Sequence, residues 1–133
     1  MKSKFKAMVL SCMDPRFQHL IQNHLKKKKL IGKYSAFTIA GAAVGVTHKK
    51  FKQWHKTFYD NLATSIQLHK IEKLIVINHK DCGATKIANG KKNFTPANEK
   101  KIHQESFAII KNRFPKLKVE LNLMSLDSKI TKF

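Results

Sequence analysis

The stretch Lys73-Leu-Ile-Val-Ile-Asn-His-Lys-Asp-Cys-Gly-Ala84 joins an apolar run to two residues of metal-binding types. Residues 74–77 are unbroken and apolar, and three of them are β-branched. Such a run is typical of a strand that is buried on both faces, as in a parallel sheet. His79 and Cys82 follow where the run ends. Because ligands of open α/β sheets gather beyond the carboxyl ends of the strands, we expect the functional site here.

Three further segments are predicted to be strands. Residues 5–11 and 34–40 are short apolar runs, and Val119, Leu121 and Leu123 alternate with polar residues near the end of the chain. The small residues 41–45 follow the second run, and small side chains let the backbone approach a bound group closely.

Helices are predicted between these strands because apolar residues recur there at helical spacing. The helices should cover about residues 15–29, 49–69 and 97–114, and turn residues predict a loop over 89–93. The resulting order, β-α-β-α-β-α-β, predicts a single α/β domain over residues 1–133: a mostly parallel sheet with helices on both faces. The expected core stripes are Phe17, Leu20, Ile21 and Leu25; Phe51, Trp54, Phe58, Leu62 and Ile66; and Ile102, Phe107, Ile110 and Phe114.

The charge of +19 comes almost entirely from lysine, since only two arginines occur, Arg16 and Arg113. Arginine is the usual bidentate reader of bases and phosphates, so the composition does not favour specific nucleic-acid recognition. A lysine-rich solvated surface is the preferred interpretation, and nonspecific attraction to polyanions stays open. No apolar run reaches membrane-spanning length, and residues 1–4 lead into a strand instead of a signal-peptide core. We therefore expect a cytoplasmic protein without a membrane partner.

Cys12 is the candidate third ligand of a metal site that includes His79 and Cys82. It follows the first predicted strand, and parallel strands end at the same edge of a sheet. If the two strands are neighbours, two sulfurs and an imidazole converge, which is a typical tetrahedral zinc set with one position left over. That position is filled either by water or by Asp14. Arg16 is near enough to hold Asp14 ionised, so the carboxylate could close the site or accept a hydrogen bond from zinc-bound water.

Each of these residues also has a structural interpretation. Either cysteine could be a small core residue, His79 a hydrogen-bonded core histidine, and Asp14 an N-cap of the helix that begins at Pro15. The other histidines lie in polar helical contexts and are predicted to be surface residues: His19, His24, His48, His55, His69 and His103. With only two cysteines in an expected reducing compartment, Cys12 and Cys82 are predicted to bind metal or act in catalysis, not to cross-link.

Two motifs resemble those of the β-class carbonic anhydrases. Cys12-Met-Asp-Pro-Arg16 and His79-Lys-Asp-Cys-Gly-Ala84 are similar to that family's paired Cys-x-Asp-x-Arg and His-x-x-Cys motifs. Residues 60–77 resemble the helix and strand that lead into the second motif, and residues 105–123 resemble the closing helix and strand.

The resemblance implies a short form of the Rossmann-like β-carbonic anhydrase fold. It implies Zn²⁺ on Cys12, His79 and Cys82, an Asp14–Arg16 catalytic dyad, and a zinc lyase that hydrates carbon dioxide reversibly to bicarbonate through zinc-bound hydroxide. It also implies a homodimer or higher homo-oligomer with active sites near the subunit interface.

Three alternatives remain beside the hydratase. The family often has Arg-Asn-Ala-Gly after its second strand, whereas this chain has Thr38-Ile-Ala-Gly41, which favours a divergent zinc-binding homologue without appreciable hydratase activity. Relatives of the fold hydrolyse carbonyl sulfide or carbon disulfide. The third alternative is a polyanion-binding protein, whose binding would fall steeply with salt and ignore substitutions of Cys12 and Cys82.

Overall fold

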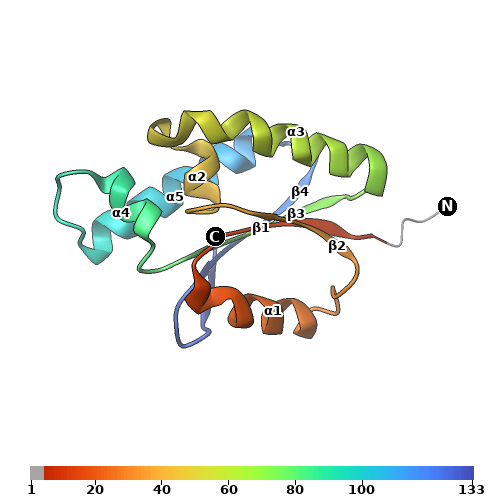
Figure 1. Ribbon diagram of the computed structural model, residues 1–133, viewed down its shortest axis with the longest axis horizontal. Coiled ribbons are helices and arrows are strands. Elements are labelled where there is room, and N and C mark those ends of the chain that lie inside the picture. The colour runs from red at the N-terminus through yellow and green to blue at the C-terminus, as the bar shows by residue number, and fades with distance from the viewer. Residues whose placement is uncertain (1–4) are drawn as a thin grey trace.

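Within residues 5–133, five strands form one sheet in the order β2-β1-β3-β4-β5. The computed structural model describes residues 5–133. The first four strands are parallel and only β5 is antiparallel, so the predicted mostly parallel sheet is confirmed (Figure 1). The strands are β1 (Ala7–Ser11), β2 (Tyr34–Thr38), β3 (Lys73–His79), β4 (Lys118–Met124) and β5 (Ile130–Lys132).

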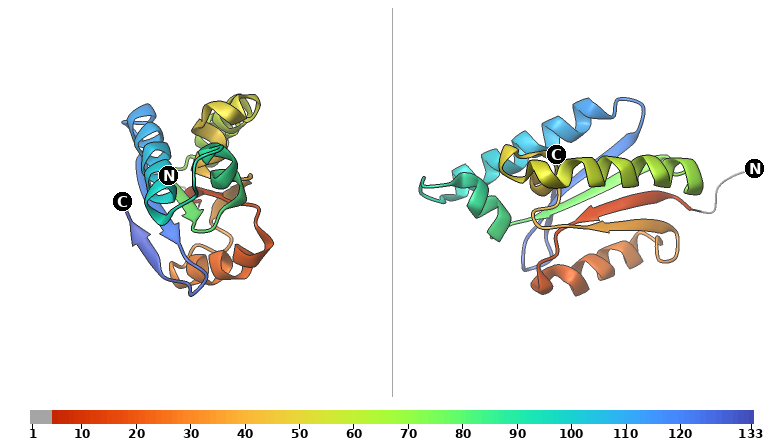
Figure 2. Two further views of the ribbon diagram at one scale, coloured as in Figure 1. Left: turned by 90° about the vertical axis from the view of Figure 1, so that its left-hand side faces the viewer. Right: turned by 45° about the horizontal axis from the view of Figure 1, so that its top comes forward.

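Helices cover both faces of this sheet, as predicted. One face carries α1, while α2, α3 and α5 lie over the other, with α4 packed beside α5 (Figures 1 and 2). Their bounds are α1 (Gln18–Lys27), α2 (Ala43–Thr47), α3 (Lys52–His69), α4 (Gly83–Asn89) and α5 (Pro96–Arg113), with short 3-10 turns at η1 (Pro15–Phe17) and η2 (Lys49–Phe51).

Strand β3 is the central core strand that the apolar run predicts. Leu74 and Val76 point into the cluster under α3 and α5, which contains Phe58. Ile75 and Ile77 point into the opposite cluster under α1. Burial on both faces explains why this strand has no polar alternation.

The predicted helices form with shifted ends. Pro15 has no N–H to donate and begins a 3-10 turn, with α1 following from Gln18. At the other end, Lys29 adopts a positive φ of 60°, which stops α1 before the predicted boundary. In α3, Phe58 and Leu62 are buried as expected, but Ile66 is 39% exposed because it faces a surface pocket.

Three short elements have no sequence signal of their own: α2, α4 and β5. The first of them, Ala43-Val-Gly-Val-Thr47, is too short for propensity to stabilise it. Its first four residues are buried, and the Ala43 N–H donates to Asn78 Oδ1 over 3.0 Å. Tertiary contacts therefore form this helix.

The prediction that the remaining histidines lie at the surface is wrong for His103. This side chain is 0% exposed, and Asn78 Nδ2 donates to its Nδ1 over 2.9 Å. It shares the core-facing side of α5 with Phe107 and Ile110, at spacings of four and seven residues. Of the others, His19 is exposed, whereas His24, His48, His55 and His69 are half-buried. Burial lowers the pKa of His103 to about 4, so its ring is neutral at pH 7.

No helix within residues 5–133 has both the length and the apolar character needed to cross a bilayer.

Candidate metal centre

Cys12, His79 and Cys82 come together at the carboxyl edge of the sheet. Cys12 follows the last residue of β1, His79 ends β3, and Cys82 precedes α4. Because β1 and β3 are paired neighbours, their ends lie side by side. The three potential ligand atoms all lie within 4.8 Å of one another, and all three residues are buried.

The imidazole of His79 is oriented to present one free nitrogen to this cluster. Its Nδ1 lies 2.7 Å from the Lys80 carbonyl oxygen, which assigns the proton to Nδ1. The Phe17 ring stacks on it at a centroid distance of 4.0 Å and fixes its plane. The other nitrogen, Nε2, is buried and has no hydrogen-bond partner among residues 5–133. A buried lone pair without a hydrogen-bond partner costs free energy. This arrangement is therefore better explained by His79 as a metal ligand than by His79 as a hydrogen-bonded core residue.

The pKa values of the two thiols are shifted in opposite directions. The Cys12 S–H donates to Cys82, and burial adds to the effect, so the pKa of Cys12 is raised. The same hydrogen bond lowers the pKa of Cys82. Opposite pKa shifts are expected where two thiols share one proton, and a cation bound by both sulfurs would displace that proton. The Gly41 N–H also donates to Cys12 Sγ, over 3.3 Å, which supports negative charge there.

Asp14 and Arg16 form a bidentate ion pair at the rim of the cluster. Arg16 Nη2 lies 2.8 Å from Asp14 Oδ2, and Arg16 Nε lies 3.2 Å from Oδ1. These hydrogen bonds lower the pKa of Asp14 to about 2, so the carboxylate is ionised at neutral pH. Its Oδ2 lies 3.8 Å from His79 Nε2. Asp14 also accepts from the Arg16 backbone N–H and caps η1, so the same carboxylate is both a helix cap and the partner of Arg16 in an ion pair.

Asp81 belongs to the same network, although no sequence pattern predicted a role for it. Arg16 Nη1 donates to Asp81 Oδ2, and Nη2 donates to the Asp81 carbonyl oxygen, both over 3.0 Å. The Asp81 N–H donates to Glu99 Oε2 over 2.8 Å. Asp81 has a left-handed φ of 58°, which turns its side chain back toward Arg16. Arg16 is the sequence feature that could have pointed to Asp81. A guanidinium has five N–H donors, which is more than the Asp14 carboxylate can accept.

A pocket of about 440 Å³ opens directly beside the cluster. Cys12, Asp14, Gly41 and Gly83 line it, together with small or apolar neighbours. Gly41 has a φ of 82°, and a Cβ there would lie 2.9 Å from the Ala84 Cβ. The small residues thus let the backbone approach the cluster, and the Gly41 N–H reaches Cys12 Sγ; close approach to a bound group stays a prediction.

Comparison with known proteins identifies the family. A family model described as "Putative carbonic anhydrase" matches residues 1–130. An uncharacterized protein of Rickettsia conorii is 30% identical over 125 residues, which cover 90% of this chain and 67% of that protein. One of Rickettsia bellii is 30% identical over 128 residues, which cover 92% and 78%.

Solved structures with the same fold are β-carbonic anhydrases. CafA of Aspergillus fumigatus superposes with a TM-score of 0.68 at 10% identity, over 98% of this chain and 76% of that chain. A tetrameric enzyme of Sordaria macrospora superposes with a TM-score of 0.60 at 10% identity, over 99% and 82%. These likenesses concern the fold, and the family-model match carries the assignment: the chain belongs to the carbonic anhydrase family and has the β-carbonic anhydrase fold.

Proposed function

We propose that this protein hydrates carbon dioxide reversibly to bicarbonate, with a zinc ion held by Cys12, His79 and Cys82. Two observations carry the proposal: a ring nitrogen of His79 and two buried sulfurs lie within 4.8 Å of one another, and the buried Nε2 has no hydrogen-bond partner among residues 5–133. Two sulfurs and one imidazole are a donor set that zinc prefers, and three protein ligands leave the open position typical of catalytic sites. Zinc in such a site lowers the pKa of water to about 7, which supplies a nucleophile at neutral pH.

The residues around the open position have separate tasks in this proposal. Arg16 holds the Asp14 carboxylate ionised and fixed in direction through two parallel hydrogen bonds. Asp14 Oδ2 can then accept a hydrogen bond from water and orient its lone pair toward the substrate. The pocket lined by Ala40, Gly41 and Ala84 offers apolar walls to an uncharged substrate such as carbon dioxide.

Stopped-flow carbon dioxide hydration on zinc-loaded protein tests this function. We expect hydration that depends on zinc and disappears with a chelator. Stoichiometric zinc without hydration would support the divergent homologue instead. Turnover of carbonyl sulfide or carbon disulfide in its place would move the protein to the related hydrolases.

Chelation should expose the two sulfurs to oxidation. Sulfurs on one tetrahedral ion lie roughly 4 Å apart, given Zn–S bonds of about 2.3 Å, so a disulfide needs only modest backbone adjustment. We expect chelated, air-exposed protein to lose two hydrogens in mass spectrometry, through a Cys12–Cys82 disulfide that zinc prevents. Cys82→Ser is the control, because it cannot form this bond. Equal oxidation with and without zinc would contradict shared ligation.

Asp81→Gly should separate a positioning role of Asp81 from a purely structural one. Glycine adopts the left-handed φ of 58° without strain, so the melting temperature should stay close to the parent's. Arg16 nevertheless loses one of its carboxylate partners, and we expect kcat to fall about 10-fold with zinc retained. Asp81→Asn keeps an acceptor and tolerates this backbone, so it should recover most of the rate. Parental activity in Asp81→Gly would leave Asp81 only a turn residue.

We also propose that the chain forms a homodimer or higher homo-oligomer. The Sordaria macrospora neighbour is described as tetrameric. In this chain β2 lies at an open edge of the sheet, and Met13 beside the cluster is 63% exposed. Sedimentation velocity over a range of concentrations should show a species larger than one chain. A monomer at all concentrations would contradict this.

A further inference from the structure

The edge of the sheet opposite the cysteine cluster carries much of the positive charge. The parallel strands start there in register, at Ala7, Tyr34, Lys73 and Lys118. The ends of α1 and α3 and the segments that enter the strands lie at the same side, on the right in Figure 1. We define this amino edge as residues 5–7, 26–34, 66–73 and 114–119. It contains ten lysines and one acidic residue, Glu72.

Most of these lysines are presented to solvent. Lys28 and Lys73 are half-buried and both pair with Glu120, at 2.8 Å each. The other eight are exposed: Lys6, Lys26, Lys27, Lys29, Lys33, Lys70, Lys116 and Lys118. At the carboxyl edge, by contrast, Asp14 and Asp81 offset Arg16. The seven residues of β3, roughly 20 Å long, separate this edge from the cysteine cluster.

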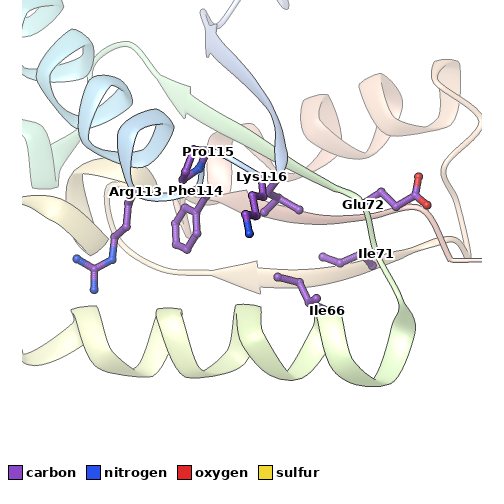
Figure 3. Close-up of a pocket in the computed structure, with 8 residues that line it drawn as sticks. Ile66, Ile71, Glu72, Arg113, Phe114, Pro115 and Lys116 are labelled. Atoms are coloured by element: carbon purple, nitrogen blue, oxygen red, sulfur yellow. The ribbon is translucent and has the colours of Figure 1, made fainter.

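Aliphatic side chains are exposed among these lysines. Ile31 lies in the turn between Lys29 and Lys33 and is 45% exposed, and Leu68 in the last turn of α3 is 67% exposed. Ile66 lines a pocket of about 490 Å³ with Ile71 and Phe114. Figure 3 shows this pocket between α3 and the chain that leads into β4. Lysines around exposed aliphatics form a surface with both charge and apolar contact to offer.

We propose that the amino edge docks on an anionic lipid bilayer. The lysines contact the lipid headgroups, while Ile31 and Leu68 enter the boundary with the acyl chains. A membrane partner was not predicted from the sequence, and the proposed docking does not depend on the proposed enzymatic function. In this orientation the cluster of Cys12, His79 and Cys82 faces away from the lipid, so the pocket beside it stays open to solution.

The chemistry of the edge favours a bilayer over a nucleic acid. The cations of this edge are all lysines. Arg113, which lies next to the edge in the sequence, stacks on the Tyr59 ring at 4.0 Å from the ring centroid. Lysine binds as a point charge and gives little bidentate readout. Exposed aliphatics gain nothing from a phosphate backbone, whereas they gain free energy by leaving water at a lipid surface.

Co-sedimentation with vesicles tests this inference on the full chain. We expect binding to vesicles of phosphatidylcholine mixed with phosphatidylserine, little binding to phosphatidylcholine alone, and release as salt rises. The triple variant Lys26→Gln, Lys27→Gln, Lys33→Gln should bind roughly 100-fold more weakly, since each lysine near an anionic surface contributes about fivefold. The matched control is Lys91→Gln, Lys92→Gln, Lys100→Gln, which removes the same charge from exposed positions after α4 and near the start of α5. These segments lie at the opposite end of the molecule (Figure 1), so this variant should bind like the parent.

A second pair of variants tests whether the exposed aliphatic side chains contribute to vesicle binding. Leu68→Ser should weaken vesicle binding about fivefold without changing its salt dependence. Leu126→Ser, at an exposed position in the turn between β4 and β5, should leave binding unchanged. Equal weakening by both triple variants would reduce the effect to net charge and overturn the assignment to this edge. Binding to a DNA duplex but not to phosphatidylserine vesicles would overturn it in favour of a nucleic acid.

Discussion

Replacing Cys12 with serine should remove most of the zinc that we propose for this protein. A serine hydroxyl stays protonated at neutral pH and is a poor ligand, and His79 and Cys82 alone leave zinc two protein donors. Loss of a supporting group outside the ligand set costs up to about 100-fold in affinity, so loss of a ligand should cost more than that. Zinc per chain, measured by elemental analysis after dialysis against a metal buffer, gives the result directly.

Two further measurements make this prediction specific. Met13→Ser changes an exposed neighbour of Cys12 and should keep one zinc per chain. Substitution with cobalt should give sulfur-to-metal absorption in the parent and a weaker band in Cys12→Ser, since one thiolate is gone. Full zinc occupancy in Cys12→Ser would end the proposed ligand assignment.

Arg16→Lys should keep zinc and lose about 10- to 100-fold of the hydration rate. The guanidinium holds Asp14 through Nε and Nη2 and reaches Asp81 through Nη1. An ammonium group is a single point charge and cannot keep the direction of the carboxylate. Stopped-flow kinetics with zinc analysis on the same samples separates a positioning effect from loss of metal.

The two other members of this series are Asp14→Asn and Arg113→Lys. Asn is as good a helix cap as Asp, so Asp14→Asn should leave the melting temperature nearly unchanged while lowering the rate and keeping zinc. Arg113 stacks on Tyr59, far along the chain from the cluster, and lysine can also lie over an aromatic ring, so this control should resemble the parent. Parental turnover in Arg16→Lys would show that the dyad has no catalytic role.

The strands of the core could be predicted from local pattern because burial on two faces leaves a direct signature. The apolar run at residues 74–77 became β3, and the alternation at Val119, Leu121 and Leu123 became β4. The meeting of Cys12 with His79 and Cys82 was also predictable, because parallel strands end at one edge. Single-domain organisation over residues 1–133, the identity of the metal and the roles of Asp14 and Arg16 stay predictions.

What only the tertiary structure decided are the contacts between segments that are distant in the sequence. The neighbouring position of β1 and β3 puts the sulfurs within reach, and the Lys80 carbonyl selects the free nitrogen of His79. Packing of α5 buries His103, and a left-handed turn aims Asp81 at Arg16. The basic amino edge gathers lysines from four segments that no local pattern relates. Periodicity reports which face of one element is buried, whereas the partner across the interface follows from the order of the strands and the path of the chain between them.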